Sequence, residues 1–137
     1  MLSPLLFVLY LNSYIESNCN DGSKGIFLDE MFPNLFLLLY ADDIAQFTDR
    51  VWYLQNQINT LRKFCTLSGM RVNASKTQII VFRNGGIAKS NEIWFLNAQE
   101  LEVVPYYKYL GLFFSSRLNR SYATKCLSVH QQSLVYD

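Results

Sequence analysis

The sequence predicts an α+β domain in which an antiparallel sheet, including a two-stranded hairpin, packs against helices. Three observations favour this class. Half of the 137 residues are hydrophobic, which is enough for a sizeable core in a chain of single-domain length. Aromatic residues, mostly Tyr and Phe, make up 15% and suit sheets and packed cores. Segments with helical spacing of apolar residues alternate with short apolar runs typical of strands.

The first predicted element is a helix that begins at Ser3 and Pro4. Serine is a good helix cap, and proline is tolerated in the first turn. Apolar residues then continue through Ile15. The segment from Ser17 to Gly25 is rich in Asn, Asp, Ser and Gly, so it predicts a loop.

A hairpin is predicted next, because two short apolar runs, Leu35–Ala41 and Ile44–Phe47, are separated only by Asp42 and Asp43. Two adjacent carboxylates repel each other, and burying them is costly unless a cation lies beside them. Asp-Asp is also not the usual hairpin pair, since no glycine supplies the positive φ angles. The aspartates at this tip therefore form either an exposed acidic turn or a site that holds a cation.

The clearest helix follows the hairpin, with Val51, Leu54, Ile58, Leu61 and Cys65 spaced by three and four residues. This apolar stripe is the face that packs on the sheet, and a glycine follows at its end. The rest of the chain is predicted as a strand from Gln78 to Phe82, three further strands in EIWFL, ELEVV and KYLGLFF, and a helix from Ser121 onward.

Charge is divided unevenly along the chain although the net charge is only +1. Residues 1–50 contain two basic and seven acidic residues, whereas residues 51–137 contain ten basic and four acidic residues. The division suits a metal-binding edge beside a phosphate-binding surface, or an ordinary solvated surface. The three widely separated cysteines argue against a disulfide framework and favour an intracellular, reducing compartment. No apolar run reaches the roughly 20 residues that a membrane-spanning helix needs.

Four segments carry a resemblance to one family. Tyr40-Ala41-Asp42-Asp43 resembles the active-site box of reverse transcriptases. LSPLLFVLYLN resembles the helix before that box, SGMRVNASKTQIIVF the Lys-Thr segment after it, and YYKYLGLFF the Tyr-Leu-Gly motif that follows. Their order and spacing are most similar to the polymerases of non-LTR, LINE-like retrotransposons. An RNA-dependent RNA polymerase is disfavoured, because its comparable hairpin commonly reads Gly-Asp-Asp and it would not explain the Tyr-Leu-Gly box.

The resemblance implies a partial polymerase palm over residues 1–120, with a small C-terminal β-hairpin, and the truncated start of a thumb or connection over residues 121–137. It implies RNA-directed DNA synthesis: a DNA primer is extended on an RNA template from deoxynucleoside triphosphates. Two Mg²⁺ ions, or Mn²⁺ in their place, serve as cofactors. By resemblance, Asp42 is the principal metal ligand and Asp43 a weaker or outer one.

The other residues carried over from the family have roles that fit their chemistry. Lys76 places a cation near the triphosphate or protonates the pyrophosphate; the alternative is an ordinary surface lysine. Asn73 more readily shapes its loop than touches substrate, and Gly111 is explained equally by a strand bulge. The residues that bind the nucleotide and the template are Ser3, Pro4, Tyr40, Ala41 and Asn73. The residues that bind the primer are Tyr109, Leu110 and Gly111. Contacts with the template–primer backbone are expected from Arg62, Lys63, Arg71, Arg83, Lys89 and Lys108.

One departure from the family matters for activity. The family's catalytic centre has a third carboxylate on a strand upstream of LSPLLF, and that strand and the fingers are missing from this sequence. We therefore expect the chain to be inactive alone and to act as a segment of a longer polymerase, intracellular and, by resemblance, nuclear. The alternative is a non-catalytic retrotransposon remnant that binds nucleic acid or protein through its basic half.

Overall fold

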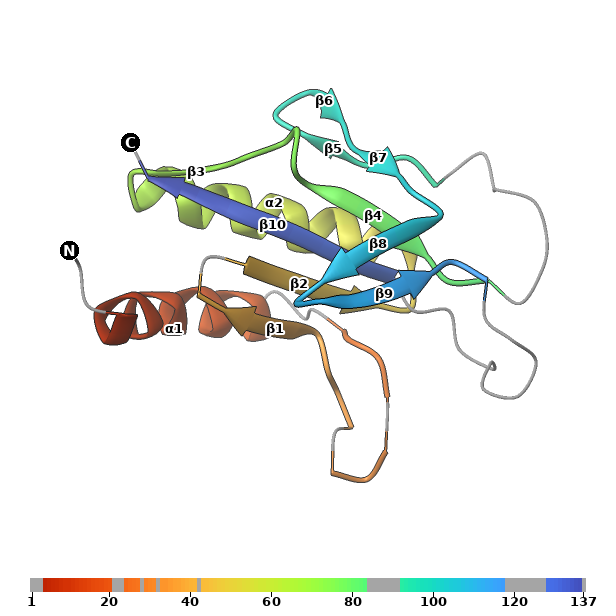
Figure 1. The fold of residues 1–137 in the computed structure, drawn as a ribbon. Coiled ribbons are helices and arrows are strands. Elements are labelled where there is room, and N and C mark those ends of the chain that lie inside the picture. Colours follow the sequence, from red (N-terminus) through yellow and green to blue (C-terminus); the bar gives the residue numbers. More distant parts are fainter. Residues whose placement is uncertain are drawn as a thin grey trace.

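A computed structural model of the chain describes residues 4–20, 24–27, 29–31, 33–41, 43–83, 92–117 and 128–136. Helix α1 (Pro4–Asn20) and helix α2 (Val51–Leu67) confirm the two helices predicted before and after the hairpin. Both pack on one face of the main sheet, and a separate hairpin lies over the other face (Figure 1). Neither described helix has the length and apolarity needed to cross a bilayer.

Helix α1 is longer than predicted, because residues 17–20 were expected in a loop and are helical. The Ser17 hydroxyl donates a hydrogen bond to the Ser13 carbonyl oxygen (2.8 Å), and the Asn18 amide donates to the Tyr14 carbonyl oxygen (3.0 Å). Small polar side chains near a helix end commonly bond back to the preceding turn in this way. The polar composition that predicted a loop here instead ends the helix.

The main sheet has the strand order β1-β2-β10-β4-β7, with β3 also paired to β10. Its pairs are antiparallel except for β4 and β7, which run parallel. Strands β5 and β6 form one separate hairpin, and β8 and β9 form another. The bounds are β1 Leu37–Tyr40, β2 Asp43–Thr48, β3 Met70–Val72, β4 Gln78–Val81, β5 Phe95–Leu96, β6 Gln99–Glu100, β7 Glu102–Val103, β8 Tyr106–Tyr109, β9 Leu112–Ser115 and β10 Ser128–Tyr136.

The segment KYLGLFF, predicted as one strand, is two strands joined by the turn Leu110-Gly111. Both turn residues have positive φ angles, 49° for Leu110 and 84° for Gly111. Two successive positive φ angles match a tight hairpin turn whose twist fits the flanking strands. The glycine is therefore explained by turn conformation rather than by a bulge.

The helix predicted from Ser121 onward is wrong for the residues that the structure describes there. Residues 128–136 form β10, in the middle of the main sheet (Figure 1). Residues 128–131 pair with β2 on one side and with β4 on the other. The edges they cover belong to buried residues such as Ala45 and Ile80, whose backbone N–H and C=O groups need partners. Because β2 and β4 need hydrogen-bond partners for these backbone groups, and because Val129 and Val135 are β-branched, this segment forms a strand.

The sheet separates two apolar layers. Ile44 of β2 packs with Tyr14 of α1 and Leu61 of α2, whereas the next residue, Ala45, packs with Tyr109 of β8. Successive strand residues face opposite sides of a sheet. Odd-numbered residues of β2, beginning with Asp43, therefore face the β8–β9 hairpin, and even-numbered residues face the helices.

Candidate active site at the β1–β2 hairpin

The hairpin that carries the Tyr-Ala-Asp-Asp segment is formed by β1 and β2, with Tyr40 paired to Asp43. Asp43 was predicted at the tip, but it is the first residue of β2. Asp42 lies outside the described residues. Ala41 has a φ of 51°, a left-handed conformation that residues other than glycine rarely adopt. Leu110, at the matching position of the β8–β9 turn, has a φ of 49°, so the angle at Ala41 follows from its two-residue hairpin connection.

The carboxylate of Asp43 lies beside the β8 strand. Asp43 is half-buried, and its negative charge raises the pKa of both Tyr107 and Tyr109, although burial of the two phenols is the larger cause. No ion pair involves Asp43 within the part of the chain that the structure describes. A partly buried carboxylate that forms no ion pair is free to ligate a cation, and carboxylate oxygens are the ligands that Mg²⁺ prefers.

Tyr109, a member of the predicted primer-binding set, lies within the electrostatic field of this carboxylate. Its side chain is 6% exposed, and its hydroxyl forms no hydrogen bond with the described residues. The turn residues that follow, Leu110 and Gly111, are exposed. The structure therefore brings the Tyr-Leu-Gly segment to the same face of the sheet as Asp43, with its turn open to solvent.

The loop between β3 and β4 is organised by Asn73. Its side-chain oxygen accepts hydrogen bonds from the Ser75 hydroxyl (2.7 Å) and the Lys76 N–H (3.2 Å). Its backbone oxygen accepts from the Thr77 N–H (3.0 Å) and hydroxyl (2.8 Å). Asn73 therefore holds the shape of this loop, which was the alternative to direct contact with substrate.

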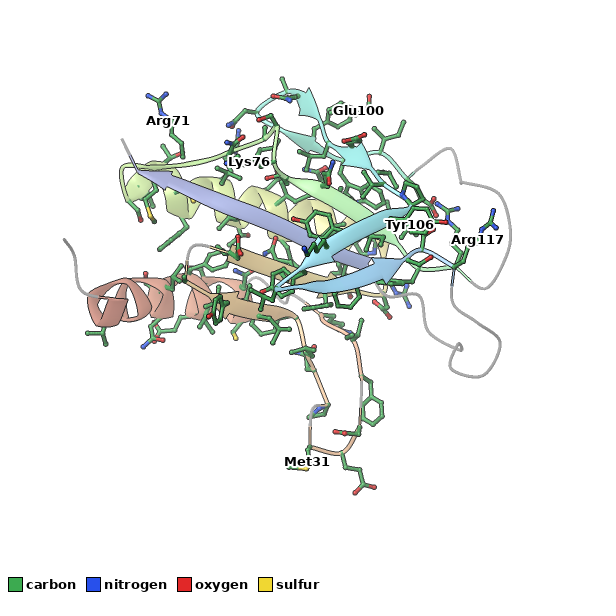
Figure 2. The ribbon with its side chains drawn as sticks, in the orientation of Figure 1. Met31, Arg71, Lys76, Glu100, Tyr106 and Arg117 are labelled. Carbon is green, nitrogen blue, oxygen red and sulfur yellow. The ribbon has the colours of Figure 1, made fainter. Side chains whose placement is uncertain are left out.

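Lys76 lies on that loop (Figure 2), and the strand register places it at the same end of the main sheet as Asp43. Ser133 of β10 pairs with Asp43 on β2, and Gln131 pairs with Gln78 on β4, two residues after Lys76. Strand β10 thus separates the lysine from the carboxylate. The Lys76 side chain is exposed, and its ammonium group has no ion-pair partner among the described residues.

The remaining predicted residues are less informative. Ser3 lies outside the described residues, and Pro4 is the first residue of α1. Tyr40 ends β1 with its side chain 62% exposed. The structure brings Asp43 and Tyr109 together, and it places Lys76 at the same end of the sheet without contact.

The sequence did not single out Tyr107, which shares the electrostatic field of Asp43 with Tyr109. The sequence did contain a signal for Tyr107, because two tyrosines at alternate positions of a strand point to the same face of the sheet.

The described residues contain no group of three or more His, Cys, Asp or Glu side chains that would hold a metal ion. Asp42 lies outside those residues, so Asp43 is the described member of the candidate metal-ligand pair. The carboxylate oxygens it offers are those that Mg²⁺ prefers, but that ion also needs near-octahedral coordination. A complete centre requires at least one further carboxylate beside Asp43.

The basic residues predicted to contact the template–primer backbone differ in their surroundings. The Arg83 guanidinium donates to the Glu92 carboxylate in a largely buried ion pair, so its charge is already compensated and the predicted backbone contact is disfavoured. Lys89 lies outside the described residues. The other four are exposed: Arg62 and Lys63 on α2, Arg71 on β3 and Lys108 on β8.

An antiparallel hairpin with an acidic residue, set in a sheet backed by two helices, is compatible with the palm of a nucleic-acid polymerase. Residues 1–114 match the sequence profile of the family described as reverse transcriptase (RNA-dependent DNA polymerase). The chain belongs to this reverse transcriptase family. No solved structure matches the chain.

A relative specifies the kind of reverse transcriptase. The chain is 30% identical, over 120 residues, to a retrovirus-related Pol polyprotein from type-1 retrotransposable element R2 of Popillia japonica. The alignment covers 82% of this chain and 16% of the relative, so the chain spans about one sixth of that polyprotein. The assignment to the non-LTR group is thereby confirmed.

Replacing Asp43 by asparagine is expected to lower the pKa of Tyr107 and Tyr109, because one of the causes that raise it is removed. The remaining burial keeps both values above 10.0, the ordinary pKa of tyrosine. Ultraviolet titration of tyrosinate measures the shift. Asp49→Asn, at an exposed acid beyond the other end of β2, is the control and is expected to leave the titration unchanged.

Asp43→Asn is also expected to change how the free energy of unfolding depends on pH. Since folding raises these pKa values, the phenols ionise first in the unfolded chain, and their stabilisation is complete below about pH 10 and declines above it. The decline is expected to be shallower in Asp43→Asn. An equal decline in both proteins would show that the Asp43 charge does not reach the two tyrosines.

Proposed function

We propose that this chain is the palm segment of an RNA-directed DNA polymerase that extends a DNA primer on an RNA template by two-metal nucleotidyl transfer. The observation that carries the proposal is Asp43, a half-buried carboxylate without an ion-pair partner in the described chain, at the start of β2 in a reverse transcriptase domain. The family generally uses divalent metal ions such as Mg²⁺.

Asp42 and Asp43 are the residues that would hold Mg²⁺, or Mn²⁺ in its place. The bound ions would activate the primer 3′ hydroxyl and stabilise charge on the leaving pyrophosphate. Lys76 adds an exposed positive charge at the same end of the sheet, suited to the triphosphate of the incoming deoxynucleotide. The exposed turn Leu110-Gly111, supported from below by Tyr109, is suited to contact the primer end.

The other assignments follow from the same resemblance. Ser3, Pro4, Tyr40 and Ala41 would contact the incoming nucleotide and the template. Residues 1–120 form the palm portion, and residues 121–137 lead into the thumb or connection, with β10 pairing back onto the palm sheet. The enzyme would act inside the cell, in the nucleus.

By resemblance, a third carboxylate is required beside Asp42 and Asp43. We infer that a polypeptide of this sequence alone does not polymerise and that the segment works within a longer protein. The relative of which it spans 16% is such a longer protein.

The test is primer extension by a chimera in which this chain replaces the matching segment of the Popillia japonica polyprotein. With an RNA template, a labelled DNA primer, deoxynucleoside triphosphates and Mg²⁺, we expect extension by the chimera and none by the isolated chain. A chimera that binds the primer–template but does not extend it would favour the alternative, a non-catalytic remnant that binds nucleic acid or protein. Extension by the isolated chain would overturn the inferred need for a longer protein.

A further inference from the structure

The side-chain hydroxyl of Tyr109 is buried without a hydrogen-bond partner among the described residues. The same holds for one oxygen each of Gln46 and Gln57, but these side chains are still anchored through their amide nitrogens. The Gln46 amide donates to the Tyr14 hydroxyl, and the Gln57 amide donates to the Phe47 carbonyl oxygen. Tyr109 has a single polar side-chain atom, so its polar end is wholly unpaired. Native proteins pair most buried polar groups, and an exception calls for an explanation.

This hydroxyl belongs to the side of the sheet that carries Asp43. The Tyr109 ring packs with Ala45 and Ile80 in one apolar cluster beneath the β8–β9 hairpin, which lies over the main sheet (Figure 1). Ala45 and Asp43 are alternate residues of β2, so their side chains leave the same face of the sheet, about 7 Å apart along the strand. Burial raises the pKa of Tyr109 most, and the negative charge of Asp43 raises it further. Tyr109 therefore packs next to the position of a candidate metal ligand.

The carboxylate of Asp43 is the kind of acceptor that this hydroxyl lacks. Asp43 is half-buried, and its side chain forms no hydrogen bond or ion pair within the described part of the chain. A carboxylate has two oxygens, so one can ligate a cation while the other accepts a hydrogen bond. The two groups are not hydrogen-bonded to each other in the structure. Hydrogen bonds at active sites are often long before the reactants are bound and shorten in the complex.

Tyr109 does not contact a primer directly, although it was carried over with the primer-binding residues. Its side chain is 6% exposed and its hydroxyl is completely enclosed, whereas Leu110 in the following turn is exposed. A phenylalanine would fill the same space without burying an unpaired polar atom. Packing alone therefore does not explain a tyrosine here, and the hydroxyl can act only on groups inside the protein.

We propose that Tyr109 is a positioning residue for the metal site, and that its hydroxyl donates a hydrogen bond to one Asp43 oxygen when the other oxygen faces the metal ion. Such a bond fixes the orientation of the carboxylate. Loss of a partner behind a metal ligand commonly lowers metal affinity about 10–100-fold. The inference rests on the proposed metal-dependent function and adds a residue that acts through Asp43.

The first measurement is urea unfolding of the whole chain, without divalent metal, for the parent and for Tyr109→Phe. Phenylalanine keeps the ring and its packing but removes the unpaired hydroxyl, so we expect a higher urea midpoint. A lower midpoint would show that the hydroxyl already has a partner in the metal-free protein, and it would overturn the proposal. Tyr106→Phe is the matched control and is expected to leave the midpoint unchanged. Tyr106 is 67% exposed and lies on the opposite face of β8 from Tyr109.

The second measurement is Mn²⁺ binding to the chimera with the Popillia japonica polyprotein, followed by electron paramagnetic resonance. Tyr109→Phe is expected to weaken Mn²⁺ binding about tenfold, although it stabilises the metal-free chain. Tyr106→Phe is expected to leave the affinity unchanged. A stabilised Tyr109→Phe chain with unchanged Mn²⁺ affinity would overturn the proposal, because the hydroxyl would then be a packing defect without a role at the metal.

Asp43→Asn separates failure of this inference from failure of the proposed function. If Asp43→Asn weakens Mn²⁺ binding and Tyr109→Phe does not, the metal site stands and the role of Tyr109 is wrong. If neither variant weakens it, Asp43 is not a ligand, and the metal assignment fails together with this inference. In the double variant we expect no loss beyond that of Asp43→Asn, because Tyr109 acts through Asp43. Additive losses would show that Tyr109 affects the metal by another route and would overturn the proposal.

Discussion

Replacing Trp94 by alanine is expected to lower the free energy of unfolding by about 3–5 kcal/mol, the usual cost of truncating a fully buried aromatic residue. Trp94 is 1% exposed and packs against Leu54 and Ile58 of α2 and Ile79 of β4. Its indole N–H also donates a hydrogen bond to the Val51 carbonyl oxygen (2.9 Å) at the start of α2. The substitution therefore opens a cavity between helix and sheet and removes a bond that fixes the helix. Urea unfolding followed by circular dichroism measures the change.

The other tryptophan supplies the control for this prediction. Trp52 is next to Val51 on α2 but is 53% exposed, so Trp52→Ala is expected to cost less than about 1 kcal/mol. Comparable losses from the two substitutions would mean that Trp94 is not the buried link between α2 and the sheet. The intrinsic fluorescence of the Trp52→Ala protein, which then reports Trp94 alone, is expected to be blue-shifted until unfolding.

Within the extending chimera, Asp42→Asn is expected to lower the rate of nucleotide addition by about two to three orders of magnitude. Loss of a principal metal ligand removes several kcal/mol of transition-state stabilisation, and each factor of ten in rate corresponds to about 1.4 kcal/mol. Asp43→Asn is expected to have a smaller effect. By resemblance, Asp42 is the principal ligand and Asp43 a weaker or outer one, so the two carboxylates are not equivalent. Primer extension under single-turnover conditions measures both rates.

Two further results decide whether these losses arise at the metal site. Asp49→Asn, an exposed acid that follows β2, is expected to retain full activity. Electron paramagnetic resonance of Mn²⁺ is expected to show weaker binding in both aspartate variants, in the same order as their activities. If the variants bind Mn²⁺ as tightly as the parent but no longer extend the primer, Asp42 and Asp43 are not metal ligands and contribute to extension in another way.

The elements set by local pattern were predictable from sequence. The stripe from Val51 to Cys65 specifies α2 because its spacing matches one face of a helix. The two apolar runs around the aspartates specify β1 and β2, and the pairing of Tyr40 with Asp43 follows from their short connection. The four motif segments carried the family, and the matching profile and relative confirm it.

The parts set by distant contacts were not predictable. Residues 128–136 have no strong helical or strand signal of their own, and the unpaired edges of β2 and β4 decide their conformation. The position of Tyr107 beside Asp43 depends on how the β8–β9 hairpin folds over the sheet, which no local spacing encodes. The pairing of Arg83 with Glu92 likewise joins residues whose proximity only the tertiary fold determines.

The central place of β10 has a consequence for how the chain reaches this fold. Ser128 pairs with Thr48 and with Val81, residues that precede it by 80 and 47 positions. Contacts of such long sequence separation form slowly, because the intervening chain must be ordered before they are made. Until they form, β2 and β4 present open edges on which a second nascent chain can add a strand. Slow synthesis at low temperature and refolding at high dilution should therefore raise the yield of monomer, since both favour closure within one chain over pairing between chains.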